Sequence, residues 1–71
     1  MDKDTFLRLL GDHVAKLRAK KAWSQSELAR VADIERQHVH RLENGQINPS
    51  IFFLKRIANA LEVTLPELVN F

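Results

Sequence analysis

The stretch SQSELARVADIERQHVHRLENG, residues 24–45, decides the fold of this chain. Ser24 is a good helix cap, and Glu27 follows three positions later, which is the spacing of a capping box. After two turns the pattern breaks at Asp33, a residue type that tolerates a left-handed backbone. A second helical run then ends at Gly45, a residue type that stops helices well. The stretch therefore predicts two short helices joined by a tight turn.

Helical patterns also cover the sequence on both sides of this stretch. From about residue 4 to residue 20, apolar residues recur at three- and four-residue steps. Ser50 is placed to cap another helix with an apolar stripe, and TLPE at 64–67 opens a short last helix. No repeat or flexible linker separates these segments. We therefore predict an all-α, five-helix single domain over residues 1–71, with its core between about 10 and 68.

The composition excludes several classes of protein. The 71 residues include no cysteine, which excludes disulfides, thiol nucleophiles and thiolate metal sites. No apolar run approaches the ~20 residues that span a bilayer, so we expect a cytoplasmic protein without a membrane partner. The net charge is only +2, but residues 13–41 hold seven Lys or Arg against three Asp or Glu. This concentration of positive charge suggests an anionic partner.

The predicted helix over about 35–43 has an apolar side and a polar side. At ~100° per residue, Val39 and Leu42 fall on one side of it. A sector of ~140° on the other side contains only hydrogen-bonding side chains, namely Arg36, Gln37, His40, Arg41 and Asn44. His38 and His40 lie ~200° apart, so they cannot bind one metal ion together, and no metal site is predicted.

Arg, Gln and Asn are the side chains that match the edges of DNA bases. Arg fits guanine O6 and N7, and Gln or Asn fits adenine N6 and N7. A short helix that displays them after another short helix and a tight turn is the helix-turn-helix arrangement. An ordinary solvated helix more often carries Glu and Lys pairs, whereas this polar sector contains no acidic residue. The pattern therefore favours DNA binding.

The sequence SQSELARVADIERQHVHRLENGQINPSIFFLKRIANALEV resembles the DNA-binding domain of the phage repressor and Cro-type family, also called the Xre family. The resemblance extends from about Leu10 to Leu68. Its individual motifs are weak alone but specific in this order and spacing; they are Leu17-Arg18, SQSELA, the series Val39, Leu42, Glu43 and Gly45, Pro49-Ser50 and IANALEV. The resemblance implies a phage-repressor-like domain in which Ser24–Glu43 is the helix-turn-helix and its second helix enters the major groove.

Carried over by position, the resemblance implies two sets of DNA contacts. The base-contacting residues would be Arg36, Gln37, His40 and Arg41. The contacts to the DNA backbone would come from Ser24, Gln25, His38, Asn44, Gln46 and Asn48, with His38 also within reach of bases. The family also pairs an arginine late in its first helix with the glutamate before the NG stop. Here these residues are Arg18 and Glu43, and we predict a buried ion pair.

Two positions depart from the family pattern. Asp33 stands where glycine is usual, and Glu35 stands where Ser or Thr is usual. Asp33 can adopt the turn geometry, so the motif is expected to survive. Glu35 is a poor cap and brings negative charge near phosphates. It either favours the helix dipole or accepts a hydrogen bond from a cytosine amine, and the sequence does not choose between these roles.

The resemblance implies a sequence-specific transcriptional regulator that binds double-stranded DNA at a palindromic operator as a homodimer. Two-fold pairing would place two recognition helices about 34 Å apart. The predicted dimer interface is apolar and consists of Phe52, Leu65, Leu68, Val69 and Phe71. The alternative is an antitoxin-type protein-interaction module with a toxin partner, whose DNA binding is autoregulatory.

No set of residues at useful spacing points to catalysis, so we expect neither an enzyme nor a cofactor. The small format resembles phage Cro proteins and the controller proteins of restriction–modification systems. The choice among controller, phage and antitoxin roles stays open. The operator sequence, repression or activation, any ligand and the protonation of His38 and His40 stay open as well.

Overall fold

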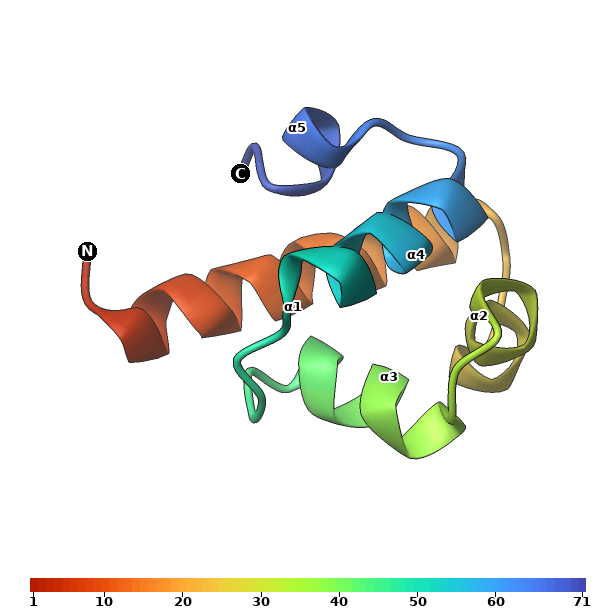
Figure 1. The fold of residues 1–71 in the computed structure, drawn as a ribbon, viewed down its shortest axis with the longest axis horizontal. Helices are drawn as coiled ribbons and strands as arrows, with labels where there is room; N and C mark the ends of the chain where they lie inside the picture. The colour runs from red at the N-terminus through yellow and green to blue at the C-terminus, as the bar shows by residue number, and fades with distance from the viewer.

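Four of the five helices begin at a side chain that caps their first turn. The computed structural model describes residues 1–71, and its helices are α1 (Lys3–Lys20), α2 (Gln25–Ala32), α3 (Arg36–Glu43), α4 (Ile51–Leu61) and α5 (Leu65–Leu68) (Figure 1). The capping side chains are Asp2, Ser24, Ser50 and Thr64, and those of α2 and α5 form complete capping boxes. The predicted all-α, five-helix architecture is confirmed.

Two helix starts differ from the sequence prediction by one residue. α1 begins at Lys3 because the Asp2 carboxylate accepts a hydrogen bond from the Thr5 N–H at 2.7 Å. α3 begins at Arg36 because the backbone of Glu35 is extended, with φ −74° and ψ 142°. Its side chain makes no capping hydrogen bond, as expected of a poor cap.

Left-handed residues end several of the helices. Asp33 has φ 58° between α2 and α3, as its residue type allows, and Gly45 has φ 68° after α3. Ala22 and Glu62 also adopt positive φ, at 58° and 60°. Neither residue type favours that conformation, so the sequence did not indicate these two turns.

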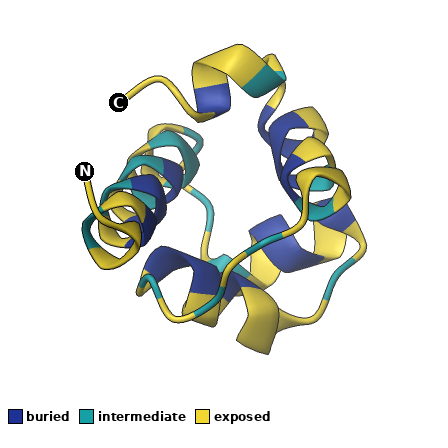
Figure 2. Ribbon diagram, turned by 60° about the vertical axis from the view of Figure 1, so that its left-hand side comes forward, coloured by how far each residue is buried: buried dark blue, intermediate teal, exposed yellow.

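The helices form a ring around the core, in the spatial order α1, α3, α2, α4, α5 and back to α1 (Figure 2). α1 and α4 overlap in the view of Figure 1 but lie on opposite sides of this ring. The buried parts of each helix face the centre of the ring, and the exposed parts face outward. The molecule measures 31 × 23 × 21 Å, and none of its helices is long and apolar enough to cross a membrane.

The core takes side chains from every helix. Its largest fully buried members are Leu10, Val14, Leu28, Val39, Leu42, Ile57 and Leu68. Leu68 is 0% exposed, so the prediction that it belongs to a dimer interface is wrong. The short helix α5 turns Leu68 inward, and this side chain closes the core where α5 joins α4 and α1.

Candidate nucleic-acid interface

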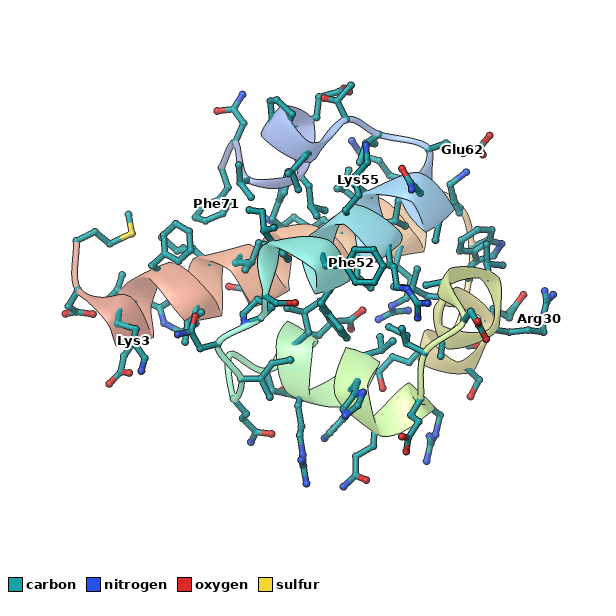
Figure 3. The ribbon with its side chains drawn as sticks, viewed as in Figure 1. Lys3, Arg30, Phe52, Lys55, Glu62 and Phe71 are labelled. Atoms are coloured by element: carbon teal, nitrogen blue, oxygen red, sulfur yellow. The ribbon has the colours of Figure 1, made fainter.

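The outward side of α3 carries the polar side chains that the sequence places there. Val39 and Leu42 on the other side are buried in the core. All five members of the predicted sector are exposed: Arg36, Gln37, His40, Arg41 and Asn44. We call these five residues the α3 strip. In Figure 3, side chains project from the lower side of α3 away from the rest of the molecule (Figure 3). The strip therefore has two guanidinium groups, two amides and an imidazole available for contacts with a partner.

Asn44 also has a role within the protein. Its Nδ2 donates a hydrogen bond to the His40 carbonyl at 2.8 Å, and it lies 3.4 Å from the His40 ring nitrogens. The same carbonyl also accepts from the Asn44 backbone N–H at 3.1 Å, so the backbone and the side chain of Asn44 both bond to the last turn of α3. The side-chain bond also holds the His40 and Asn44 side chains next to each other on the strip.

A buried ionic network fixes the C-terminal end of α3 against α1. Nε of Arg18 donates to Oε2 of Glu43 at 2.6 Å, and a second guanidinium nitrogen donates to Oε1 at 2.8 Å. A third nitrogen of Arg18 donates to the Trp23 carbonyl at 2.7 Å. The Glu43 side chain is only 5% exposed, and its hydrogen bonds raise the pKa of Arg18 above its ordinary value. The predicted pair of Arg18 and Glu43 is thus present with bidentate geometry; Glu43 is buried and Arg18 is partly buried.

Gln25 extends this network to α2. Its Nε2 donates to Oε1 of Glu43 at 3.0 Å, so one carboxylate accepts from both α1 and α2. The sequence pointed to a phosphate contact for Gln25 and did not indicate this bond. Because the amide has two N–H groups, one remains for a phosphate while the other is bonded to Glu43. The predicted phosphate contact of Gln25 stays a prediction.

Gly11 lets the backbones of α1 and α3 meet. A Cβ atom at this position would lie 2.5 Å from the carbonyl oxygens of Leu42 and Glu43. Real Cβ atoms do not approach backbone oxygens so closely, so any larger residue would push the two helices apart. The sequence showed only that this glycine lowers helix propensity; the structure shows that close packing needs it.

The N-terminal end of α3 has fewer attachments. Asp33 in the preceding turn accepts a hydrogen bond through its carbonyl from Arg56 of α4, at 2.9 Å. Glu35 is exposed and forms neither a cap bond nor an ion pair. His38 is exposed, and its ring packs on the ring of Phe53 in a T-shaped arrangement with the centroids 6.0 Å apart. Together with neighbouring residues these groups line an open surface cavity of about 370 Å³.

The remaining predicted contacts to the DNA backbone lie at the start of α2 and in the loop after α3. Ser24 is exposed, and its Oγ accepts a hydrogen bond from the Glu27 N–H at 3.1 Å. Gln46 and Asn48 are exposed in the loop that follows α3. The structure therefore leaves each of these side chains accessible, and their contacts with DNA stay predictions.

The predicted dimer residues divide into two groups. Phe52 is 66% exposed on the outer side of α4, next to Ile51, which is 69% exposed and which the prediction did not include. Val69 and Phe71 are partly exposed at the C-terminus, where Phe71 packs on Phe6 at a centroid distance of 5.3 Å. Phe52 and Phe71 lie well apart in Figure 3. Leu65 is half-buried and packs against the core.

The chain matches the helix-turn-helix family over residues 14–68, which is most of its length. It is 35% identical over 63 residues to the HTH-type transcriptional regulator SinR of Bacillus licheniformis, and this match covers 87% of the chain but 57% of SinR. The chain therefore spans little more than half of that relative. It is 37% identical over 61 residues to the control protein C.MunI of Mycoplasma sp., covering 84% of the chain and 82% of C.MunI.

The fold also matches a solved structure. The restriction-modification controller protein C.AhdI from Aeromonas hydrophila superposes with a TM-score of 0.85 at 34% identity. The match covers 87% of this chain and 94% of C.AhdI. The helices of this chain are thus arranged as in C.AhdI over most of the length of both chains.

Proposed function

Because this chain belongs to the Xre-type helix-turn-helix family, we propose that it is a sequence-specific DNA-binding transcriptional regulator. In this proposal it binds a palindromic operator as a homodimer, with α3 in the major groove. The observation that carries the proposal is the exposure of the whole α3 strip on a helix that is anchored from its other side. The resemblance to controller proteins such as C.MunI and C.AhdI favours a controller-type role for this small domain.

The residues of the strip suit the edges of bases in the major groove. Arg36 and Arg41 carry planar guanidinium groups that match guanine O6 and N7, and Gln37 matches adenine N6 and N7. His40 lies between them on the exposed side. Each well-placed bidentate contact contributes about 1–3 kcal/mol of discrimination against the wrong base. A strip of this size reads only a few base pairs, and a second copy is needed to specify an operator.

Pairing of two chains is proposed to involve the outer side of α4. Ile51 and Phe52 are the two most exposed large apolar side chains after the terminal Met1. Exposed apolar groups side by side are typical of protein contact surfaces. A two-fold axis next to this surface would place two α3 helices on one side of the dimer, about one turn or 34 Å of duplex apart.

The proposal is tested by titrating the protein with two duplexes at one fixed salt concentration. A duplex selected from a random pool and found to be palindromic is compared with a scrambled duplex of the same composition. We expect specific binding at least about 10³-fold tighter than binding to the scrambled sequence. Equal affinity for both duplexes would contradict a sequence-specific reader.

A matched pair of variants separates base reading from general charge. Arg36→Ala removes a guanidinium from the strip, whereas Arg30→Ala removes one from the exposed side of α2, away from the strip. We expect Arg36→Ala to lower specific binding about 5- to 150-fold, equivalent to about 1–3 kcal/mol. Arg30→Ala is expected to leave the ratio of specific to non-specific affinity unchanged. Equal effects of the two variants would show that the protein recognises the charge of the duplex and not its base sequence.

The antitoxin alternative is not proposed, since none of the three named relatives is described as an antitoxin. Purification of the tagged protein from its native host provides the check. Recovery of a stoichiometric second protein chain would support that alternative, and a homodimer by light scattering would support the regulator.

A further inference from the structure

Arg56 is the one residue of α4 whose side chain is hydrogen-bonded to the helix-turn-helix segment. It is half-buried, and one of its terminal nitrogens donates to the Asp33 carbonyl at 2.9 Å. Asp33 is the left-handed residue of the turn, with φ 58°, and it directly precedes the two residues that lead into α3. The backbone conformation of Asp33 sets the direction in which the chain enters α3. Arg56 therefore acts on the start of α3 without belonging to it.

The same guanidinium group also contacts the outer side of α4. Its central carbon lies 5.3 Å from the centroid of the Phe52 ring, which is the geometry of a cation–π contact. Phe52 is 66% exposed, so its other side faces solvent. A planar guanidinium can donate from its edge while its face rests on a ring, and Arg56 uses both at once.

The turn is held by two backbone hydrogen bonds to α2, from the N–H groups of Asp33 and Ile34, and by Ile34 packed against the core. Arg56 supplies its only side-chain hydrogen bond. Glu35, the residue before α3, has no capping hydrogen bond. The cavity of about 370 Å³ next to the turn is lined by Asp33, Glu35, Phe52 and Arg56 among others. Because the outer side of the turn borders this open space, the bond from Arg56 is the only side-chain hydrogen bond that fixes the turn relative to α4.

We propose that Arg56 is a positioning residue that couples the pairing surface on α4 to the orientation of α3. A second copy packed on Phe52 would fix the ring, the ring would fix the guanidinium, and the guanidinium would hold the turn that starts α3. Dimer formation and base reading are then energetically linked, although Arg56 itself touches neither a base nor a phosphate. This inference rests on the proposed function as a dimeric DNA reader.

The test compares Arg56→Met with Lys55→Met in the full chain. Both variants lose one positive charge on α4, but Lys55 is exposed and has no hydrogen bond or ring contact. We expect Arg56→Met to lower the ratio of specific to non-specific affinity about tenfold, whereas Lys55→Met leaves the ratio unchanged. An equal ratio in the two variants would overturn the inference.

The salt dependence of binding separates positioning from a phosphate contact. If Arg56 touched a phosphate, Arg56→Met would weaken binding to all duplexes alike and reduce the salt slope by about one. We expect the slope to match that of Lys55→Met. Arg56→Lys keeps the charge but lacks the planar fork, and it is expected to restore the ratio only partly. Full restoration by Arg56→Lys would also overturn the inference.

The coupling to the pairing surface is tested with Phe52→Leu, which keeps an apolar group but removes the aromatic face. Urea melts and circular dichroism establish that each variant is folded. In a double-mutant cycle, we expect the effects of Phe52→Leu and Arg56→Met on the affinity ratio to be non-additive. Additive effects would show that the two residues act separately. If the wild-type protein shows no sequence preference, the proposed function fails. If wild type does show a preference and the Arg56 and Phe52 variants keep the same affinity ratio, only this inference fails.

Discussion

The two ends of α3 are held in different ways. At the C-terminal end, the Glu43 carboxylate accepts hydrogen bonds from Arg18 and Gln25, and the backbone rests directly on Gly11. At the N-terminal end, the turn receives one side-chain hydrogen bond, from Arg56, and Glu35 does not cap the helix. One end is therefore held by several side-chain hydrogen bonds in the interior. The other is held by the backbone bonds of the turn, by Ile34 on the core and by one side-chain hydrogen bond.

This difference suggests that the two ends of α3 have different roles. The buried end keeps α3 in place on the other helices, since removal of any partner leaves a charge without its hydrogen bonds in the interior. The exposed end has a single side-chain hydrogen bond and no side-chain cap, so it can adjust by small movements of the turn more readily than the buried end. Fine adjustment of α3 on a duplex is then expected at its first turn rather than at its last.

The largest expected effect comes from breaking the buried end with Arg18→Ala. This change leaves the Glu43 carboxylate buried without its cation, and we expect a loss of about 3 kcal/mol or more in the free energy of unfolding. Urea melts of Arg18→Ala and Arg18→Met measure it, and the second variant keeps much of the apolar stem. A loss below about 1 kcal/mol would mean that the pair behaves as a surface contact.

The second test of the buried end is Gly11→Ala. Helix propensity alone predicts a gain of about 1 kcal/mol, because alanine is the better helix former. The added Cβ would lie 2.5 Å from two backbone oxygens of α3, so we expect a net loss of about 2 kcal/mol instead. Thermal or urea melts give the sign directly. A stabilised variant would show that α1 and α3 can separate without cost.

The exposed end is expected to respond in the opposite direction. Glu35→Ser supplies a side chain that can accept from the first turn of α3, and we expect a gain of about 1 kcal/mol in stability. Glu35→Gln removes the charge without adding a short cap, and it serves as the control. If both variants were equally stable, the charge rather than the missing cap would account for the effect. No gain from Glu35→Ser would show that the first turn is already well held.

The smallest expected effect is a change in the pH dependence of stability through Glu27, at the start of α2. Hydrogen bonds from the backbone and side chain of Ser24 lower the pKa of Glu27 from its ordinary 4.5. The folded state therefore binds this proton less readily than the unfolded state, so the contribution of Glu27 is present above pH 4.5 and is lost as the pH falls through its folded pKa. In Glu27→Gln, acid unfolding between about pH 5 and 3 is expected to be slightly less steep than in wild type. Unchanged steepness in Glu27→Gln would contradict this expectation.

Much of the fold followed from local signals in the sequence. The capping residues, the left-handed Asp33 and the stop at Gly45 each act within a few residues, so their spacing predicts where helices begin and end. The α3 strip followed from helix periodicity alone, because an amphipathic helix must turn its apolar side to the core. Both predictions depended only on short-range geometry.

The features that the sequence did not indicate arise from contacts between distant segments. Gly11 is needed because the end of α3 packs on it, and Gln25 bonds to a carboxylate eighteen positions away. The bond of Arg56 to the turn crosses from α4 to α2. Leu68 was assigned to a surface because periodicity over a four-residue helix cannot separate core from interface. Such pairings depend on how the ring of helices closes.

Because α3 rests on α1 through main-chain atoms at Gly11, its tilt does not depend on the identity of its outward side chains. A library that randomises Arg36, Gln37, His40 and Arg41 together would therefore leave the contact between α3 and α1 unchanged. Most members of such a library are expected to fold. If these four side chains read bases as proposed, the scaffold could be retargeted to new duplexes by changing them alone.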